Sequence, residues 1–237
     1  KVSTVSYGYD SPSDIFAIDF VGSPDGISYT MNLYDEVVKV NYSLCGKFNM
    51  YNTLAAATVS RIFGIKVATI TQGITKVVKI DGRNETFIRK DGLRVVVDFA
   101  HTPDGIANIL SYLKSVTKGR LIVVFGCGGN RDKLKRPLMG KVVANFADYV
   151  IVTNDNPRYE QPLSIVSDIE AGLTEVAYKV LLNRYEATSL ALDIASSIDT
   201  VVILGKGAEK FQEVKGKKIP YSDTDTVLSL FSAYGVK

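Results

Sequence analysis

The sequence predicts an α/β protein whose larger part is a doubly wound, Rossmann-like domain. Short strands that are apolar throughout, such as 121–125 and 201–204, alternate with amphipathic helical segments over the second part of the chain. Strands that are apolar on both faces require helices on both sides of a mostly parallel sheet. The chain has 237 residues and 46% hydrophobic content, which is enough to bury such a core.

The first 82 residues have a different pattern. Three β-prone runs separated by turn residues predict a small antiparallel meander, at 15–21, 27–33 and 37–42. Asn49 is expected to cap a following helix that ends at Gly64, and a short second helix is expected over 68–74. Three strands and two helices leave one sheet face without a partner. Residues 1–82 are therefore expected to be the end of a larger domain.

From residue 83 onward, strands and helices are expected to alternate. Apolar runs predict the strands 93–99, 121–125, 149–153 and 201–204. Apolar residues at helical spacing predict the helices, at 106–113, 138–146, 162–169, 187–198 and 223–231. In the second helix, Leu138, Met139 and Val143 are expected to share one buried face. The domain is expected to span 83–237, with Gly82 as the hinge or linker before it.

Composition excludes several classes of protein. A net charge of +3 is too small to indicate nucleic acid or an anionic membrane as a partner. No apolar run approaches the ~20 residues of a membrane-spanning helix. Cys45 and Cys127 form no disulfide framework or metal-ligand spacing, and His101 is the only histidine. A monomeric, cytoplasmic protein that acts on small molecules is therefore expected.

Polar residues follow four of the predicted strands. In an open parallel sheet, ligands bind beyond the carboxyl ends of the strands, where the loops enter helices. This rule selects four loops, at 101–104, 126–132, 154–158 and 205–209. Arg131 and Arg158 offer planar forks for a carboxylate or phosphate, and Asp155 and Glu209 offer negative charge for an ammonium. A ligand with both charges, such as an amino acid, fits this set.

Simpler interpretations exist for several of these residues. The glycines of 126–129 suggest a dinucleotide loop, but Arg131 stands where the last glycine of that motif would fall. Lys206 belongs to no phosphate-loop spacing and could be a solvated lysine, and Arg158 could be a surface residue of a turn. His101 could equally be a hydrogen-bonded structural residue. Cys127 is better explained as a small loop residue than as a nucleophile, since no second histidine exists to activate it.

Taken together, the motifs resemble those of the Mur ligases of peptidoglycan synthesis. They are, in order, 98–104 (DFAHTPD), 125–132 (FGCGGNRD) with 135–140 (KRPLMG), 155–158 (DNPR) and 205–209 (GKGAE). Residues 44–56 and 81–85 resemble the end of the family's central ATP-binding domain. The resemblance implies that 1–82 is the end of that central domain and that 83–237 is the C-terminal, amino-acid-binding domain. The family's Gly-rich phosphate loop is absent from these residues, so the chain is expected to be inactive alone.

The resemblance implies a reaction and a set of binding residues. Within the family it points to ligases that use ATP and Mg²⁺ to join a diamino acid to a UDP-N-acetylmuramoyl dipeptide through an acyl phosphate, with the Mg²⁺ site mostly outside this chain. It implies no catalytic or metal-binding residue here. The implied diaminopimelate pocket consists of Arg131, Asp155, Asn156, Arg158, Gly205 and Glu209. The implied nucleotide contacts are Asn49, Arg83, Asp98 and His101.

Arg158 also bears on the choice of amino acid. The family's lysine-adding members usually carry another residue at this position, because lysine has no distal carboxylate to pair with a guanidinium. Diaminopimelate, or an analogue such as lanthionine, is therefore preferred. Ala208 departs from the family, which commonly has histidine there. The alternatives are a lysine- or lanthionine-adding ligase, another ligase of the superfamily such as the D-alanyl-D-alanine-adding enzyme or folylpolyglutamate synthetase, and a non-catalytic α/β binding module.

Overall fold

The computed structural model describes residues 3–10 and 12–234. The chain divides into two compact units, which meet between Ile80 and Asp81 and are described separately below. Residues 1, 2, 11 and 235–237, which fall within the expected domains, lie outside the described part. None of the helices in the described part combines the length and apolar character needed to cross a membrane.

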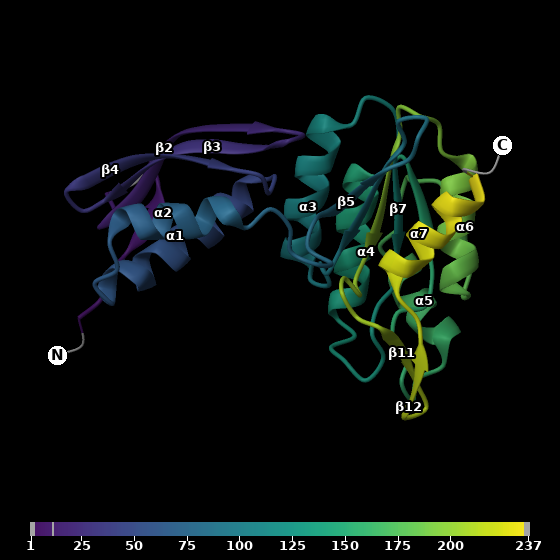
Figure 1. Ribbon diagram of the computed structural model, residues 1–237. Coiled ribbons are helices and arrows are strands. Elements are labelled where there is room, and N and C mark those ends of the chain that lie inside the picture. The colour runs from purple at the N-terminus through teal and green to yellow at the C-terminus, as the bar shows by residue number, and fades with distance from the viewer. Residues whose placement is uncertain (1–2, 11, 235–237) are drawn as a thin grey trace. The chain divides into compact units, whose positions relative to one another are not determined.

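Unit 1 is a four-stranded sheet with two helices (Figure 1). Its strands are β1 (Tyr7–Tyr9), β2 (Ile15–Ser23), β3 (Gly26–Leu33) and β4 (Glu36–Tyr42), in that spatial order. The antiparallel pairing of β2, β3 and β4 confirms the predicted meander, and β1 adds a parallel edge. Helices α1 (Lys47–Ile62) and α2 (Val67–Lys76) share one core with the sheet, in which Met31, Leu54 and Ile70 are buried.

Asn49 does not cap α1, contrary to the prediction. The helix begins at Lys47, after Gly46, whose φ of 91° suits glycine. Asn49 thus lies in the first turn, and its Nδ2 donates to the carbonyl of Cys45 at 2.8 Å. The prediction failed because glycine itself supplies the change of backbone direction, so that the helix begins before the asparagine.

Unit 2 is built on a six-stranded sheet in the order β5-β6-β10-β7-β8-β9. The strands are β5 (Glu85–Ile88), β6 (Arg94–Asp98), β7 (Leu121–Phe125), β8 (Tyr149–Val152), β9 (Tyr178–Val180) and β10 (Thr200–Leu204). All pairs are parallel except β5 with β6, so the predicted parallel sheet is confirmed, with an antiparallel edge. Its helices are α3 (Pro103–Val116), α4 (Lys135–Phe146), α5 (Pro162–Glu170), α6 (Arg184–Ile194) and α7 (Asp223–Tyr234).

Helices cover both sides of this sheet. The residues of α6 and α7 pack on one face, where Ala191, Val227 and Ile203 share a core, and α3 and α4 lie on the other side (Figure 1). In α4, the prediction for Leu138 was wrong, because that side chain is 53% exposed. Arg136 is buried instead, because its guanidinium finds carboxylate partners.

A hairpin formed by β11 (Phe211–Val214) and β12 (Lys217–Pro220) follows the last parallel strand. Neither it nor the edge strands β5 and β9 was anticipated. These strands are three or four residues long and carry polar or charged residues, so they lack the continuous apolar run that identified the central strands. The hairpin lies beside the carboxyl ends of the sheet, through a parallel bridge between Arg158 and Val214.

Candidate functional site

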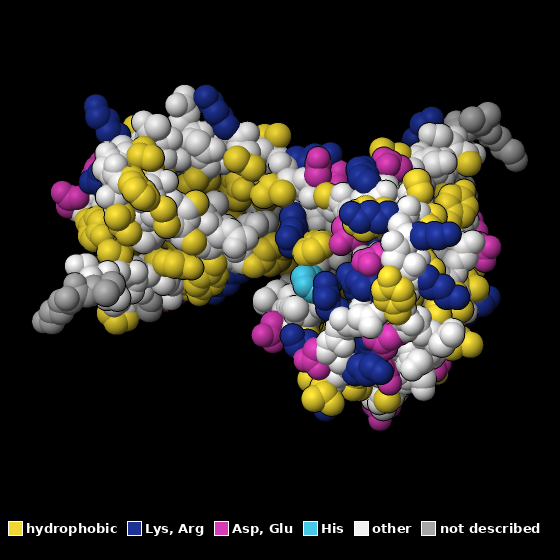
Figure 2. All heavy atoms as spheres, turned by 90° about the horizontal axis from the view of Figure 1, so that it is seen from below, with side chains coloured by type: hydrophobic (Ala, Val, Ile, Leu, Met, Phe, Trp, Pro, Cys, Tyr) yellow, Lys and Arg dark blue, Asp and Glu magenta, His cyan; other side chains and the backbone are white. Residues whose placement is uncertain are grey.

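Loops from the carboxyl ends of β6, β7, β8 and β10 surround one cavity of about 340 Å³ in unit 2. Its lining includes His101 and all six residues that the sequence assigns to the amino-acid pocket, namely Arg131, Asp155, Asn156, Arg158, Gly205 and Glu209. Figure 2 shows basic side chains, with acidic ones among them, around the histidine on this unit. Four loops that are far apart in the sequence thus line one cavity with charged residues.

The glycines after β7 allow this loop to pack closely against the loop after β8. A Cβ atom at Gly129 would lie 2.0 Å from the carbonyl oxygen of Pro157, so only glycine allows the two backbones to approach. The Gly129 N–H also donates to the carbonyl of Asn156 at 2.8 Å. Cys127, between these glycines, is buried, and desolvation raises the pKa of its thiol to about 12. A thiol held protonated in this way is a poor nucleophile, in agreement with its interpretation as a small loop residue.

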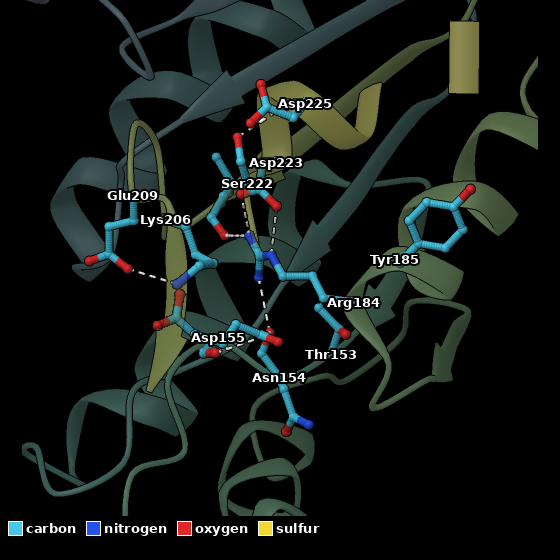
Figure 3. Close-up of polar contacts among 12 residues, drawn as sticks. Thr153, Asn154, Asp155, Arg184, Tyr185, Lys206, Glu209, Ser222, Asp223 and Asp225 are labelled. Carbon is cyan, nitrogen blue, oxygen red and sulfur yellow. Dashed lines mark hydrogen bonds and ion pairs between the residues drawn. The ribbon is translucent and has the colours of Figure 1, made fainter. Parts of the chain in front are cut away.

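Lys206 is not a solvated lysine. Its side chain is 0% exposed, and its Nζ donates to Glu209 Oε2 at 2.7 Å and to Asn156 Oδ1 at 3.0 Å (Figure 3). Asn156 Nδ2 donates to the same Glu209 oxygen at 2.9 Å. Burial alone would raise the pKa of Glu209, but the bonds from Lys206 and Asn156 outweigh it and hold the pKa below its ordinary value. Glu209 is therefore a fixed carboxylate whose Oε2 is already engaged.

Asp155 is the most deeply buried acid of the pocket. Gly205, at a φ of 112°, lies directly against it, since a Cβ atom there would come 2.6 Å from Asp155 Oδ2. Desolvation raises the pKa of Asp155, while the positive charges of Arg184 and Lys206 oppose this rise. A bound ammonium would offset the same desolvation cost, because an opposite charge favours the ionised carboxylate. The environment of Asp155 is thus suited to a cationic ligand.

The two predicted arginines differ in how they are held. Arg158 is part-buried: its Nε donates to Glu213 Oε2 at 3.0 Å and its Nη1 to the carbonyl of Gly129 at 2.8 Å. Its interpretation as an ordinary surface residue of a turn is therefore wrong. Arg131 lines the same cavity but is exposed. One arginine is thus fixed and the other is accessible to solvent.

The residues assigned to the nucleotide fall into two places. Asn49 lies in unit 1, whereas Arg83, Asp98 and His101 lie in unit 2. The Arg83 guanidinium lies 4.4 Å from the ring centre of Phe99, and the ring of His101 meets Phe99 edge to face at 4.7 Å. His101 Nδ1 contacts the Phe99 carbonyl at 3.0 Å; because a carbonyl only accepts, Nδ1 is the protonated nitrogen. The Arg83 and His101 side chains are exposed and available to a ligand.

Asp98 is buried and accepts hydrogen bonds from the backbone N–H groups of Asn84 and Ala100, both at 2.7 Å. Desolvation raises its pKa against these bonds. Asp98 therefore ties the start of unit 2 to the end of β6. The nearby Gly82, at a φ of 64°, packs so closely on the loop after β10 that a Cβ atom would lie 2.0 Å from the Ala208 nitrogen.

Two ion pairs that involve buried arginines were missed by sequence analysis. Arg184 and Asp223 are both 0% exposed and joined at 2.8 Å, and Arg184 also donates to the carbonyls of Asn154 and Leu204. Figure 3 shows Arg184 between Asp223 and the loop of Asn154. Arg136 pairs with Glu160 at 2.9 Å and donates to the Gly128 carbonyl. Their only sequence signal is their residue type, since each partner lies more than 20 positions away.

Comparison with known proteins agrees with the geometry. A family model described as "Mur ligase, glutamate ligase domain" matches residues 82–207, more than half of the chain. The UDP-N-acetylmuramoyl-L-alanyl-D-glutamate–2,6-diaminopimelate ligase of Bacillus licheniformis is 38% identical over 221 residues, which cover 93% of this chain and 45% of the relative. The ligase of the same name from Syntrophomonas wolfei is 39% identical over 228 residues, 95% of this chain and 47% of the relative.

Solved structures lead to the same family. The structure of a ligase with this same name superposes with a TM-score of 0.67 at 33% identity and covers 98% of this chain and 48% of that one. A pseudomurein peptide ligase type C from Methanothermus fervidus, at 24% identity and a TM-score of 0.68, shares the fold. The chain spans about half the length of the curated relatives it matches. It belongs to the Mur ligase family.

Proposed function

We propose that this chain is the amino-acid-binding part of an ATP-dependent ligase that joins meso-diaminopimelate to UDP-N-acetylmuramoyl-L-alanyl-D-glutamate in peptidoglycan synthesis. The single observation that carries the proposal is that the buried Asp155 and the fixed guanidinium of Arg158 line the same cavity. Relatives named for this reaction align over more than nine tenths of the chain, which supports it. By the same resemblance, residues 1–82 would be the end of the central domain and 83–237 the C-terminal domain.

The charges of the cavity match the charges of a diamino diacid. Each end of diaminopimelate carries one ammonium and one carboxylate. Asp155, whose carboxylate is desolvated, would hold the distal ammonium, and Glu209 would contribute Oε1, since both of its hydrogen bonds reach Oε2. Arg158 would pair with the distal carboxylate by a charge-assisted hydrogen bond. Arg131, being exposed, is suited to the other carboxylate, near the attacking amine.

The proposed reaction is formation of an amide through an acyl phosphate. ATP would phosphorylate the D-glutamyl carboxylate, and the proximal amine of the diamino acid would then attack the activated carbonyl and release phosphate. The residues of this chain would act by positioning the amine and not by covalent chemistry. Arg83 and His101 are exposed and both contact the ring of Phe99, so they are suited to contact the nucleotide.

Magnesium, which the family's use of ATP implies, would neutralise phosphate charge in the whole ligase. Among the described residues no group of three or more His, Cys, Asp or Glu side chains is placed to hold a metal ion. The resemblance places the Mg²⁺ site mostly outside this chain, and we assign no step of the reaction to it.

A calorimetric titration of this 237-residue chain tests the proposal. We expect meso-diaminopimelate to bind more tightly than lysine, because only diaminopimelate has a distal carboxylate that can accept hydrogen bonds from Arg158. Arg158→Ala should lower the affinity for diaminopimelate about 10- to 100-fold and leave the affinity for lysine nearly unchanged. Lys141→Ala, at an exposed position of α4, is the matched control. Equal affinity for both amino acids in wild type and variant would refute the proposal.

A further inference from the structure

The hairpin strand β11 runs beside the loop 154–158 and bonds to it repeatedly. Gln212 Nε2 donates to the carbonyls of Asn154 at 3.3 Å and Asp155 at 2.9 Å. The N–H of Glu213 donates to Asn156 Oδ1 at 2.9 Å. Three consecutive residues of the proposed pocket loop are therefore held by two residues of β11, which the sequence did not identify as a strand.

The backbone of Arg158 depends on the same hairpin. Its φ of 51° lies in the left-handed region, which residues with a Cβ atom adopt only at a cost in free energy. The N–H of Arg158 donates to the Glu213 carbonyl at 2.9 Å, and the N–H of Lys215 donates to the Arg158 carbonyl at 2.7 Å. These two bonds flank the strained residue and stabilise a conformation that the loop alone would disfavour.

The side chain of Glu213 then fixes the guanidinium. Its Oε2 accepts from Arg158 Nε at 3.0 Å, and the Gly129 carbonyl accepts from Nη1 at 2.8 Å. A guanidinium is planar with five N–H donors, so the contacts at Nε and Nη1 together set its orientation and leave three donors on the Nη atoms. Arg158 lines the cavity, whereas Glu213 does not. The side chain of Glu213 therefore reaches the cavity through the guanidinium of Arg158.

We infer that Glu213 is a specificity-determining positioning residue, which aims the Nη edge of Arg158 at the distal carboxylate of a diamino diacid. The inference rests on the proposed function and adds to it the means by which the pocket distinguishes a diacid from lysine. Bidentate pairing requires the carboxylate and the guanidinium to be coplanar, and Glu213 holds that plane in place before the ligand arrives. Loss of Glu213 should therefore weaken recognition of the carboxylate while recognition of the ammonium persists.

The first measurement needs no ligand. The Arg158 Nε–H resonance in a ¹⁵N-correlated NMR spectrum, assigned by its absence from Arg158→Lys, reports the bond to Glu213. In the wild-type chain, we expect slow exchange of this proton with water. Glu213→Ala should abolish that protection, whereas Glu213→Gln, which keeps an oxygen acceptor, should retain it. Lys217→Ala, at an exposed position of the same hairpin, should leave the resonance unchanged.

The second measurement is calorimetry with meso-diaminopimelate and with lysine on the same variants. Glu213→Ala should lower the affinity for diaminopimelate about tenfold and leave that for lysine within about twofold, since one charge-assisted bond is misaligned. Glu213→Gln should recover most of the loss, and Lys217→Ala should match the wild type. This rescue separates the geometry of Arg158 from the net charge of the hairpin, which both Glu213 variants change equally.

The outcomes are distinct. An unchanged Nε–H resonance in Glu213→Ala, or an equal loss of affinity for both amino acids, would overturn the positioning role and leave the proposed function intact. If the wild-type chain shows no preference for diaminopimelate, the proposed function and the specificity role fail together, whereas the NMR comparison still decides whether Glu213 orients Arg158. Selective loss in Glu213→Ala, with rescue by glutamine, would support the inference.

Discussion

In the part of unit 2 that we propose to bind the amino acid (the amino-acid side), Lys206, Asn156 and Glu209 are bonded to one another. In the part that we propose to contact the nucleotide (the nucleotide side), Arg83 and His101 are exposed and lie against Phe99. Lys206 reaches no solvent at all. Both sides belong to the same sheet edge of unit 2, and both are rich in charge. They differ in whether each charge has a partner within the protein.

This difference teaches how the two sides meet their ligands. A charge that is buried and paired keeps its orientation, because moving it would leave a desolvated partner behind. Such a side can distinguish ligands by where their charges lie. An exposed cation on an aromatic ring has few contacts to lose, so it can follow a ligand that arrives in several orientations. If the proposed ligands are right, we expect the amino-acid side to be the more selective of the two.

The largest expected effect comes from the ion pair beneath the amino-acid side. Arg184→Met leaves Asp223 fully buried without a counter-charge and frees the carbonyls of Asn154 and Leu204 (Figure 3). We expect the free energy of unfolding of unit 2 to fall by about 3–5 kcal/mol. Chemical denaturation of the whole chain, with hydrogen exchange at the amides of β10 as the reporter of unit 2, measures the loss.

Lys114→Met is the matched control for Arg184→Met, because it removes one cation from an exposed ion pair with Asp148. It should cost about 0–1 kcal/mol. If Arg184→Met and Lys114→Met lowered the free energy of unfolding by similar amounts, the buried ion pair beneath the amino-acid side would be no stronger than an exposed one. The contrast between the two sides would then be wrong.

A smaller effect on stability is expected at Glu160, which accepts a hydrogen bond from the backbone of Asn130 in the loop that carries Arg131. Hydrogen bonds from Arg136 lower the pKa of Glu160 to about 2, and the Asn130 N–H adds to this. The contribution to stability is present above the ordinary pKa of about 4.5 and is lost as the pH falls towards 2. Glu160→Gln should therefore lose about 2 kcal/mol at neutral pH and show a flatter dependence on pH below 4.5.

Unfolding midpoints in urea between pH 2.5 and 7 measure this effect. Glu175→Gln, which makes the same chemical change at an exposed position, should follow the wild-type curve. If the curve of Glu160→Gln were parallel to that of the wild type throughout, the pair with Arg136 would not couple to folding.

Sequence patterns predicted the parts of unit 2 in which burial is uniform. The strands 121–125 and 201–204 are apolar throughout, and this pattern occurs only where both faces of a sheet are covered. The rule that ligands bind at the carboxyl ends of parallel strands then selected the four loops that line the cavity. Both steps rest on chain-local patterns and on a general property of parallel sheets, so they need no knowledge of individual contacts.

The polar network could not be predicted in the same way. Lys206 could be interpreted as a solvated lysine from the sequence, because the Asn156 side chain that it contacts in the interior lies 50 positions away. The partner of Arg184 lies 39 positions away, and β11 carries a mixed pattern (FQEV) without an apolar run. Local patterns reveal which residues favour the interior. They do not reveal which charged residues acquire a partner that permits burial.

The smallest expected effect on stability concerns the nucleotide side. Arg83→Ala removes an exposed guanidinium 4.4 Å from the Phe99 ring, and Lys218→Ala removes an exposed ammonium at the same distance from the Phe211 ring. Each should change the free energy of unfolding by no more than about 0.5–1 kcal/mol. Only Arg83→Ala should weaken the binding of ADP to the chain, measured by NMR titration, because Arg83 is the cation assigned to the nucleotide. If Arg83→Ala lowered the free energy of unfolding as much as Arg184→Met, the nucleotide side would be held as firmly as the amino-acid side. If both alanine variants bound ADP with equal affinity, Arg83 would not be a nucleotide contact.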